Sequence, residues 1–110
     1  MTKGEYLGEL EQLVLLAVQS LGDEAYGITV RQMLEDRAGR VVSVPTVYSA
    51  LDRLEQKGYV TARLGEATAE RGGRAKRLYR VERAGMRALQ ETKRMQDRMW
   101  EAARVRPKRS

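Results

Sequence analysis

Four cationic side chains and a pair of glycines occupy one seven-residue stretch: Arg71, Gly72, Gly73, Arg74, Lys76 and Arg77. Side chains of this kind bind phosphate oxygens, and arginines also enter the minor groove of a duplex. The two glycines permit the positive backbone angles that a tight hairpin tip requires. We therefore predict that this stretch is an arm that contacts nucleic acid. The alternative is a solvated loop whose charges only aid solubility.

A helix predicted from Ser43 to Gly58 precedes this arm and carries the other polar groups that suit a duplex. Ser43 is placed to cap the helix, and Pro45 fits its first turn because an amide hydrogen has no helical partner there. Hydroxyl groups reach phosphates, and Arg53 or Gln56 reaches base edges. The predicted DNA contacts of the helix are Ser43, Pro45, Thr46, Tyr48, Ser49, Arg53 and Lys57. For Tyr48, a purely packing role fits its place beside the apolar stripe equally well.

The remaining periodicity predicts the elements that position these groups. Helical spacing of apolar residues predicts helices over residues 8–21 and 27–37. Alternation predicts strands over residues 60–64 and 76–81, with inward side chains at Val60, Ala62, Leu64, Tyr79 and Val81. Val41 and Val42 are predicted as a minor strand. The order of these elements predicts an α+β fold, mostly α, namely a winged helix-turn-helix with a two-stranded wing.

The periodicity is helical again from Glu82 to Arg104, and we predict that this long C-terminal helix mediates dimerisation. An apolar seam with three- and four-residue spacing runs along it, which suits packing against another helix. Helix 8–21 is apolar nearly all round, so it also needs a second covering surface. The predicted subunit interface is Leu10, Val14, Ala88, Thr92, Met95, Met99 and Trp100. If a gap lies between the subunits, Met95, Met99 and Trp100 form an apolar wall for a flat ligand.

The chain of 110 residues has no Cys and no His, which removes disulfides, thiolate chemistry and the usual zinc ligands. The remaining acids and bases are scattered over amphipathic helices, so we expect no enzyme activity, no metal and no cofactor. No apolar run approaches the roughly 18 residues of a membrane span, and the N-terminus lacks the apolar stretch of a signal peptide. We therefore expect a cytoplasmic protein with no membrane partner.

Charge is segregated along the chain, whose net charge is +6. Residues 1–36 carry a net charge of −5, residues 37–83 carry +6 and residues 84–110 carry +5. Such segregation points one positive surface at a polyanion. It fits a sequence-specific regulator and also a general nucleic-acid binder of the nucleoid or ribosomal kind, but the latter has no need for an apolar helical seam. A winged helix that binds another protein is the third alternative.

Several separated motifs give the chain a resemblance to a known family. They are the run from Gly8 to Leu16, the pair Tyr26-Gly27, the group Thr46, Val47, Tyr48, Leu51, Arg53, Leu54 and Gly58, and finally Gly72, Gly73, Arg74 and Tyr79. In type and spacing they resemble the PadR family of winged helix-turn-helix transcriptional regulators over nearly the whole chain. The single C-terminal helix is similar to the short branch of that family. The chain departs from the family at Glu82, where relatives commonly place a capping Thr.

The resemblance implies a homodimeric repressor that binds a pseudo-palindromic operator, with some relatives responding to small hydrophobic compounds. It implies DNA contacts from Thr46, Tyr48, Ser49 and Arg53 in the helix and from Gly73 and Arg74 in the wing. It also implies that the N-terminal and C-terminal helices pack between subunits. We accordingly predict a DNA-binding domain at residues 1–81, a dimerisation helix at residues 82–104 and a basic tail at residues 105–110. The two recognition helices would enter successive major grooves about 34 Å apart.

Overall fold

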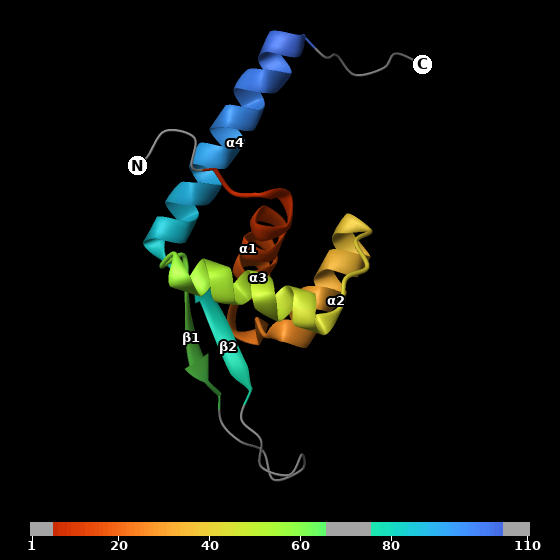
Figure 1. Ribbon diagram of the computed structural model, residues 1–110, viewed down its shortest axis with the longest axis vertical. Coiled ribbons are helices and arrows are strands. Elements are labelled where there is room, and N and C mark those ends of the chain that lie inside the picture. Colours follow the sequence, from red (N-terminus) through yellow and green to blue (C-terminus); the bar gives the residue numbers. More distant parts are fainter. Residues whose placement is uncertain (1–5, 66–75, 105–110) are drawn as a thin grey trace.

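The computed structural model describes residues 6–65 and 76–104, and these ranges contain four α-helices and one two-stranded sheet (Figure 1). The elements follow one another as α1 (Glu9–Leu21), a 3₁₀ turn (Gly22–Glu24), α2 (Gly27–Ala38), α3 (Val44–Gln56), β1 (Val60–Leu64), β2 (Arg77–Val81) and α4 (Arg83–Ala103). Helices dominate and the strands form a hairpin wing, so the predicted fold class is confirmed. Within these ranges no helix is long and apolar enough to span a bilayer.

The α1 helix lies at the centre of the helical body, where it contacts α2, α3, α4 and β2. Its sequence is apolar nearly all round, and it buries Val14, Leu15, Ala17 and Val18. Leu16 alone among its central leucine and valine residues is substantially exposed, at 45%. Since the other helices pack around it, α1 sets where the recognition elements lie.

The α2 and α3 helices form a helix-turn-helix pair that packs against α1. Their buried stripes are Val30 and Leu34 in α2 and Val47, Ala50, Leu51 and Leu54 in α3. The Ser43 hydroxyl accepts a hydrogen bond from the Thr46 amide at 3.2 Å, which is the cap that the sequence predicts. The prediction of a minor strand at Val41 and Val42 is wrong. Within the described ranges the sheet contains only β1 and β2, so this loop has no ladder to join, and Val41 is 78% exposed.

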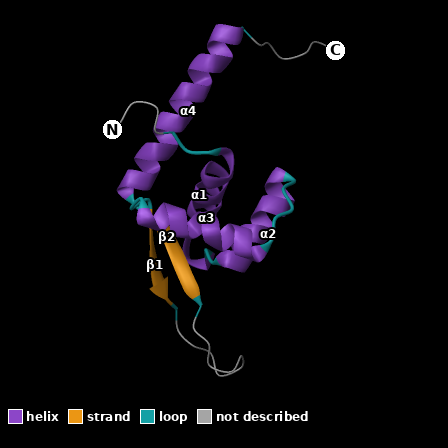
Figure 2. Cartoon of the chain, in the orientation of Figure 1, coloured by secondary structure: helices purple, strands orange, loops and turns teal. Residues whose placement is uncertain are grey.

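The two strands pair antiparallel, with Val60 opposite Val81 and Leu64 opposite Arg77. Val60 and Tyr79 are buried beneath the helices, as predicted. The prediction that Leu64 faces inward is wrong, because its side chain is 71% exposed. The hairpin leaves the helical body at that end (Figure 2), so Leu64 has little apolar surface to pack against.

The start of α4 is held tightly against the turn between α3 and β1. Glu82 precedes the helix without a side-chain cap, and its carboxylate instead accepts a hydrogen bond from the Thr61 hydroxyl at 2.7 Å. The Glu82 amide donates to the Tyr59 carbonyl at 2.8 Å. A Cβ atom on Gly85 would lie 2.3 Å from that same carbonyl oxygen, so the close approach requires glycine. Glu82 therefore ties the start of α4 to the wing and does not cap the helix.

The part of α4 from its start to Gln96 packs on the body. Its buried residues are Gly85, Ala88, Leu89 and Thr92. The Thr92 hydroxyl accepts a hydrogen bond from the Leu7 amide at 3.1 Å, which fastens α4 to the segment before α1. Gln96 exchanges two hydrogen bonds of 3.1 Å with Gln12 of α1. Beyond Gln96 the helix projects from the body (Figure 1), and Met99 and Trp100 are 64% and 62% exposed. The projecting half thus continues the helix with uncovered apolar side chains.

Candidate nucleic-acid interface

The N-terminal end of α3 presents a cluster of small polar groups to solvent. Ser43, Pro45, Thr46 and Ser49 are all exposed, so the structure brings together these four predicted contacts. The hydroxyls of Ser43 and Thr46 share a hydrogen bond of 2.8 Å. Hydroxyls and first-turn amide groups at a helix start are suited to phosphate oxygens. Among the predicted DNA contacts that the structure describes, those at this end of α3 are therefore the least obstructed.

Tyr48 is half-buried and packs its ring against the first turn of α2. A Cβ atom on Gly27 would lie 2.4 Å from the Tyr48 Cζ atom and 2.6 Å from its hydroxyl oxygen. Only glycine at this position lets the ring lie so close to α2. The Tyr48 ring therefore packs against α2, and the contact of its hydroxyl with a phosphate stays a prediction. Gly27, quoted from the sequence only as part of a motif, is the residue that makes room for the ring.

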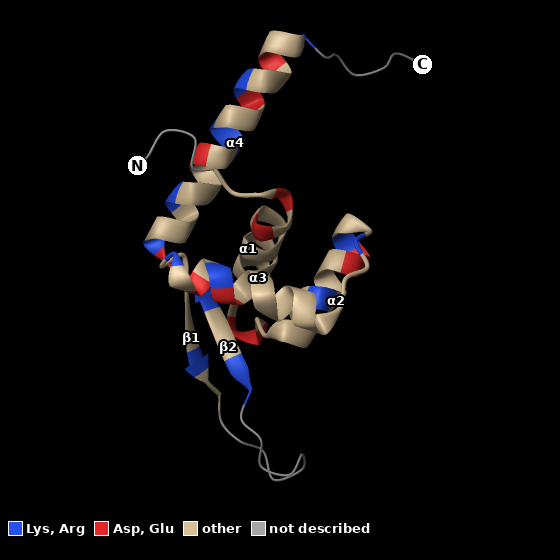
Figure 3. Ribbon diagram, in the orientation of Figure 1, with Lys and Arg blue, Asp and Glu red and all other residues tan. Residues whose placement is uncertain are grey.

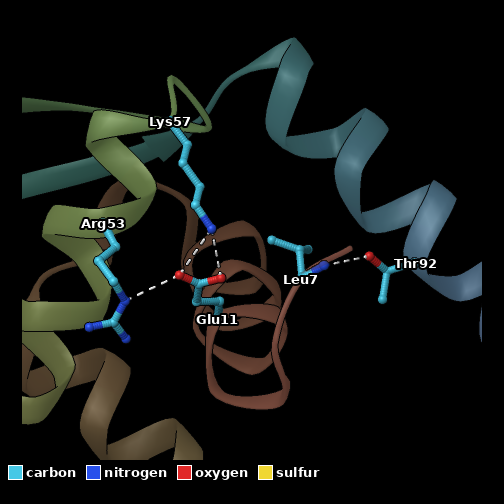
Figure 4. A network of polar contacts seen from close by, with 5 residues as sticks. All are labelled: Leu7, Glu11, Arg53, Lys57 and Thr92. Carbon is cyan, nitrogen blue, oxygen red and sulfur yellow. Dashed lines mark hydrogen bonds and ion pairs between the residues drawn. The ribbon is translucent and has the colours of Figure 1, made fainter. Parts of the chain in front are cut away.

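Both predicted cations of α3 are held by one carboxylate of α1 (Figure 4). The Lys57 ammonium lies 3.1 Å from Glu11 Oε1, and the Arg53 Nε lies 3.2 Å from Glu11 Oε2. The Glu11 side chain is only 11% exposed, whereas those of Arg53 and Lys57 are about half exposed. Burial raises the pKa of Glu11, but hydrogen bonds from Lys57 and Arg53 outweigh it, so the pKa lies below the ordinary value.

Sequence reasoning missed Glu11 as part of this surface. The signal that could have found it is a carboxylate between Leu10 and Leu13 on a helix that is otherwise apolar nearly all round. A buried carboxylate needs a charged or hydrogen-bonding partner. The sequence alone does not name that partner, because it depends on how α1 crosses α3.

The middle of the exposed α3 face is not cationic. Ser49, Asp52 and Gln56 are exposed and follow one another at three- and four-residue spacing, so they form a row along the helix. Gln56 was considered for base contacts from the sequence, and Asp52 was not. An amide pairs with adenine and a carboxylate accepts from the cytosine amino group in a major groove. This row has the chemistry of base reading, while the cations lie on its flank.

The two described cations at the start of β2 also have partners within the protein. The Arg77 guanidinium donates to Glu55 at 2.9 Å and to the Tyr79 hydroxyl at 3.0 Å, and these bonds raise the pKa of Arg77. The Lys76 ammonium donates to the Tyr26 hydroxyl at 3.2 Å and lies 4.4 Å from the centre of its ring. Both side chains are exposed, but they are tied to the helical body through Glu55 and Tyr26.

Two further cations of the wing were missed by the sequence reasoning. Arg63 of β1 and Arg80 of β2 have side chains 60% and 81% exposed. Figure 3 shows basic residues along both strands and at the adjoining end of α3. The strongest predicted contacts of the wing, at Arg71, Gly72, Gly73 and Arg74, lie outside the described residues.

The predicted subunit interface divides into two groups. Val14, Ala88 and Thr92 are at most 5% exposed within one protomer, so they belong to its own core and offer no surface to a second chain. Periodicity identified an apolar face there but not the element that covers it. The other four residues are accessible: Leu10 and Met95 are partly exposed, and Met99 and Trp100 are largely exposed. The accessible group is therefore concentrated on the projecting half of α4.

A helix-turn-helix whose second helix exposes polar groups beside a basic two-stranded wing defines the winged helix-turn-helix class of DNA-binding proteins. The model of the PadR-like family of transcriptional regulators matches residues 14–91. The chain belongs to this family and is a DNA-binding transcriptional regulator. A comparison with functionally curated proteins finds no significant match.

Solved structures of bacterial regulators share the fold. A PadR-like transcription factor from Bacteroides fragilis is similar with a TM-score of 0.74 and 23% identity, covering 86% of each chain. A transcriptional regulator from Clostridium thermocellum gives a TM-score of 0.71 and 22% identity, again covering 86% of each chain. A PadR family regulator from Eggerthella lenta gives 0.67 and 26%, covering 86% of this chain and 82% of the other. The described arrangement of helices and wing is thus that of known regulators.

Proposed function

We propose that the protein is a homodimeric repressor that binds a pseudo-palindromic operator and acts on DNA in the cytoplasm. The observation that carries this proposal is the exposed polar row of α3, a helix that contacts α1 through the Arg53–Glu11 ion pair and α2 through Tyr48, beside the basic strands. Side chains locked on a packed helix suit base reading better than side chains on a loop. The role of repressor, rather than activator, rests on the resemblance to the short branch of the family.

On the DNA side, the first turn of α3 would bind phosphates while Ser49 and Gln56 face base edges. The wing would add backbone contacts through Arg71 and Arg74. Selection of bound genomic fragments, followed by gel shifts on the recovered sequence and a shuffled version of it, tests the proposal. A sequence-specific regulator binds the recovered sequence far more tightly than its shuffled version. Equal binding of both duplexes at moderate salt would instead favour the general nucleic-acid binder.

On the dimer side, the projecting half of α4 would pack against the partner subunit. Met99 and Trp100 are large apolar side chains left uncovered on this helix. A groove of about 490 Å³ between α1 and α2, lined in part by Leu13, Leu16 and Met33, offers a second apolar surface. Sedimentation analysis of the parent and of Trp100→Ala tests this arrangement. The parent should sediment as a dimer, and the dimer of the variant should have a higher dissociation constant. A parent that sediments as a monomer would contradict the proposed dimer.

The effector side of the proposal is a small hydrophobic compound held between subunits by Met95, Met99 and Trp100. These side chains lie on an open helical surface, so one protomer alone does not enclose such a compound. Binding would favour one spacing of the two α3 helices and so change operator affinity. Titration of the dimer with planar apolar compounds, followed by Trp fluorescence, tests this. An emission spectrum that never changes would contradict a binding site at Trp100.

A further inference from the structure

The carboxylate of Glu11 is an unusual group in the core of this protein. It lies on α1 among buried apolar residues, and its two oxygens receive hydrogen bonds from Lys57 at 3.1 and 3.3 Å and from Arg53 at 3.2 Å. Replacing buried ion pairs by apolar residues is often neutral or stabilising in proteins. Stability alone therefore gives little reason for this carboxylate in the core. Because its partners, Arg53 and Lys57, lie on the flank of α3, we look for its role there.

Arg53 and Lys57 are four residues apart, so they lie on the same flank of α3, beside the exposed row of Ser49, Asp52 and Gln56. Their side chains are 50% and 46% exposed, which leaves them within reach of solvent and of a phosphate. Glu11 draws both toward α1 and compensates part of their charge. The exposed face of α3 therefore has its cations at one edge, and the residues at its centre are uncharged or acidic.

We propose that Glu11 is a positioning residue that sets the sequence specificity of DNA binding, by holding Arg53 and Lys57 in register and limiting their contact with phosphates at random sites. This inference rests on the proposed function as an operator-binding protein. Glu11 itself does not touch DNA. Its effect is on the balance between base reading, which depends on the orientation of α3 side chains, and phosphate attraction, which does not depend on sequence.

The size of the effect follows from counterion release. Each additional phosphate contact steepens the slope of log K against log salt concentration by about 0.9 on B-DNA. In the parent, Glu11 limits this contact at random sites, so one freed cation strengthens binding to a shuffled duplex by about eightfold between about 1 M and about 0.1 M salt. Freeing both cations changes the slope by up to about 1.8.

The experiment compares the parent with Glu11→Gln and Glu101→Gln, each titrated with the selected operator duplex and with a shuffled duplex of equal composition over a range of salt. Both substitutions remove one negative charge. Glu101 is exposed near the C-terminal end of α4, and this end of the helix lies far from the wing and α3 (Figure 1). Glu101→Gln controls for net charge once sedimentation has shown that it dimerises like the parent, because this part of α4 is proposed to pack against the partner subunit. The expected result for Glu11→Gln is tighter binding of the shuffled duplex, a steeper salt slope by about 0.9 or more, and an operator preference reduced about eightfold.

Two outcomes overturn the inference. One is a Glu11→Gln salt slope equal to that of Glu101→Gln. The other is a parallel loss of affinity for both duplexes, which indicates that Glu11 only stabilises the fold. Should Glu11→Gln fail to fold, Glu11→Asp keeps the charge but shortens the reach to the two cations. It should change specificity in the same direction by a smaller factor, and parental behaviour would overturn the inference.

The proposed function fails separately. A parent that binds both duplexes equally contradicts operator recognition, and the salt slopes on the shuffled duplex still report whether Glu11 restrains Arg53 and Lys57. If the parent prefers the operator but Glu11→Gln behaves like Glu101→Gln, the result contradicts only the role of Glu11.

Discussion

Replacing Thr92 by Val removes one hydroxyl from the contact between α4 and the N-terminal segment while keeping the shape of the side chain. Thr92 is 0% exposed, and its hydroxyl accepts the hydrogen bond from the Leu7 amide at 3.1 Å. In Thr92→Val that amide loses its acceptor in a buried position, which costs about 1–3 kcal/mol. An unfolding entropy of about 2.1 cal/mol/K per residue converts each kcal/mol into about 4 °C for a chain of 110 residues. The Tm should therefore fall by about 4–13 °C.

Thermal unfolding followed by circular dichroism measures this change, at one fixed protein concentration because association makes Tm concentration-dependent. Thr92→Ser is the matched control, since it keeps the hydroxyl and loses one methyl group, at a cost of about 1 kcal/mol. The Val variant should be the less stable of the two. A Val variant as stable as the parent, beside a destabilised Ser variant, would refute the reasoning and leave packing as the sole role of Thr92.

Three further predictions concern close contacts and pH. Gly27→Ala should displace the Tyr48 ring, which lies 2.4 Å from the new Cβ atom. This moves the hydroxyl away from its predicted phosphate contact, so operator binding measured by fluorescence anisotropy should weaken about tenfold. Gly85→Ala places a Cβ atom 2.3 Å from the Tyr59 carbonyl oxygen, so its free energy of unfolding in urea should fall by about 1–3 kcal/mol. Because the pKa of Glu11 is lowered in the folded state, its contribution to stability is present above its unfolded pKa of about 4.3 and is lost as pH falls through the folded pKa. Urea midpoints measured from pH 6 down to about 2 should therefore fall more steeply for the parent than for Glu11→Gln.

Each of these predictions has a contradicting result. For the two glycines, Gly8→Ala is the shared control, because among the described residues other than its chain neighbours no atom lies within 4 Å of its new Cβ atom. It should cost at most about 1 kcal/mol, through a weaker N-cap. Glycine variants that match this control would show that the close contacts relax without cost. For the acid series, parallel curves for the parent and Glu11→Gln would exclude a lowered pKa at Glu11.

The local features of the recognition surface were predictable from the sequence. Ser43 caps α3 and the polar residues of its first turn face solvent, because capping and helical spacing depend only on near neighbours in the chain. The inward faces of Val60 and Tyr79 followed from alternation in the same way. Leu64 did not, since alternation gives the face of a strand but not the point at which the strand leaves the body.

The tertiary pairings were not predictable in this way. Glu11 and Arg53 are 42 residues apart in sequence, and their contact depends on how α1 crosses α3. The apolar seam of α4 illustrates the same difficulty. Periodicity shows that a helix face is buried, but it does not show which element or subunit packs against it. The first half of the seam, at Ala88 and Thr92, packs on its own protomer, and only the projecting half with Trp100 is left open.

The most direct test of the account is an anisotropy titration of the parent protein with the selected operator duplex and with its shuffled counterpart, at about 0.15 M salt. We expect one protein dimer per operator and at least about a thousandfold preference for the operator. Equal affinity for the two duplexes, or binding of a single protomer, would contradict the claim that two α3 helices of a dimer read a specific sequence.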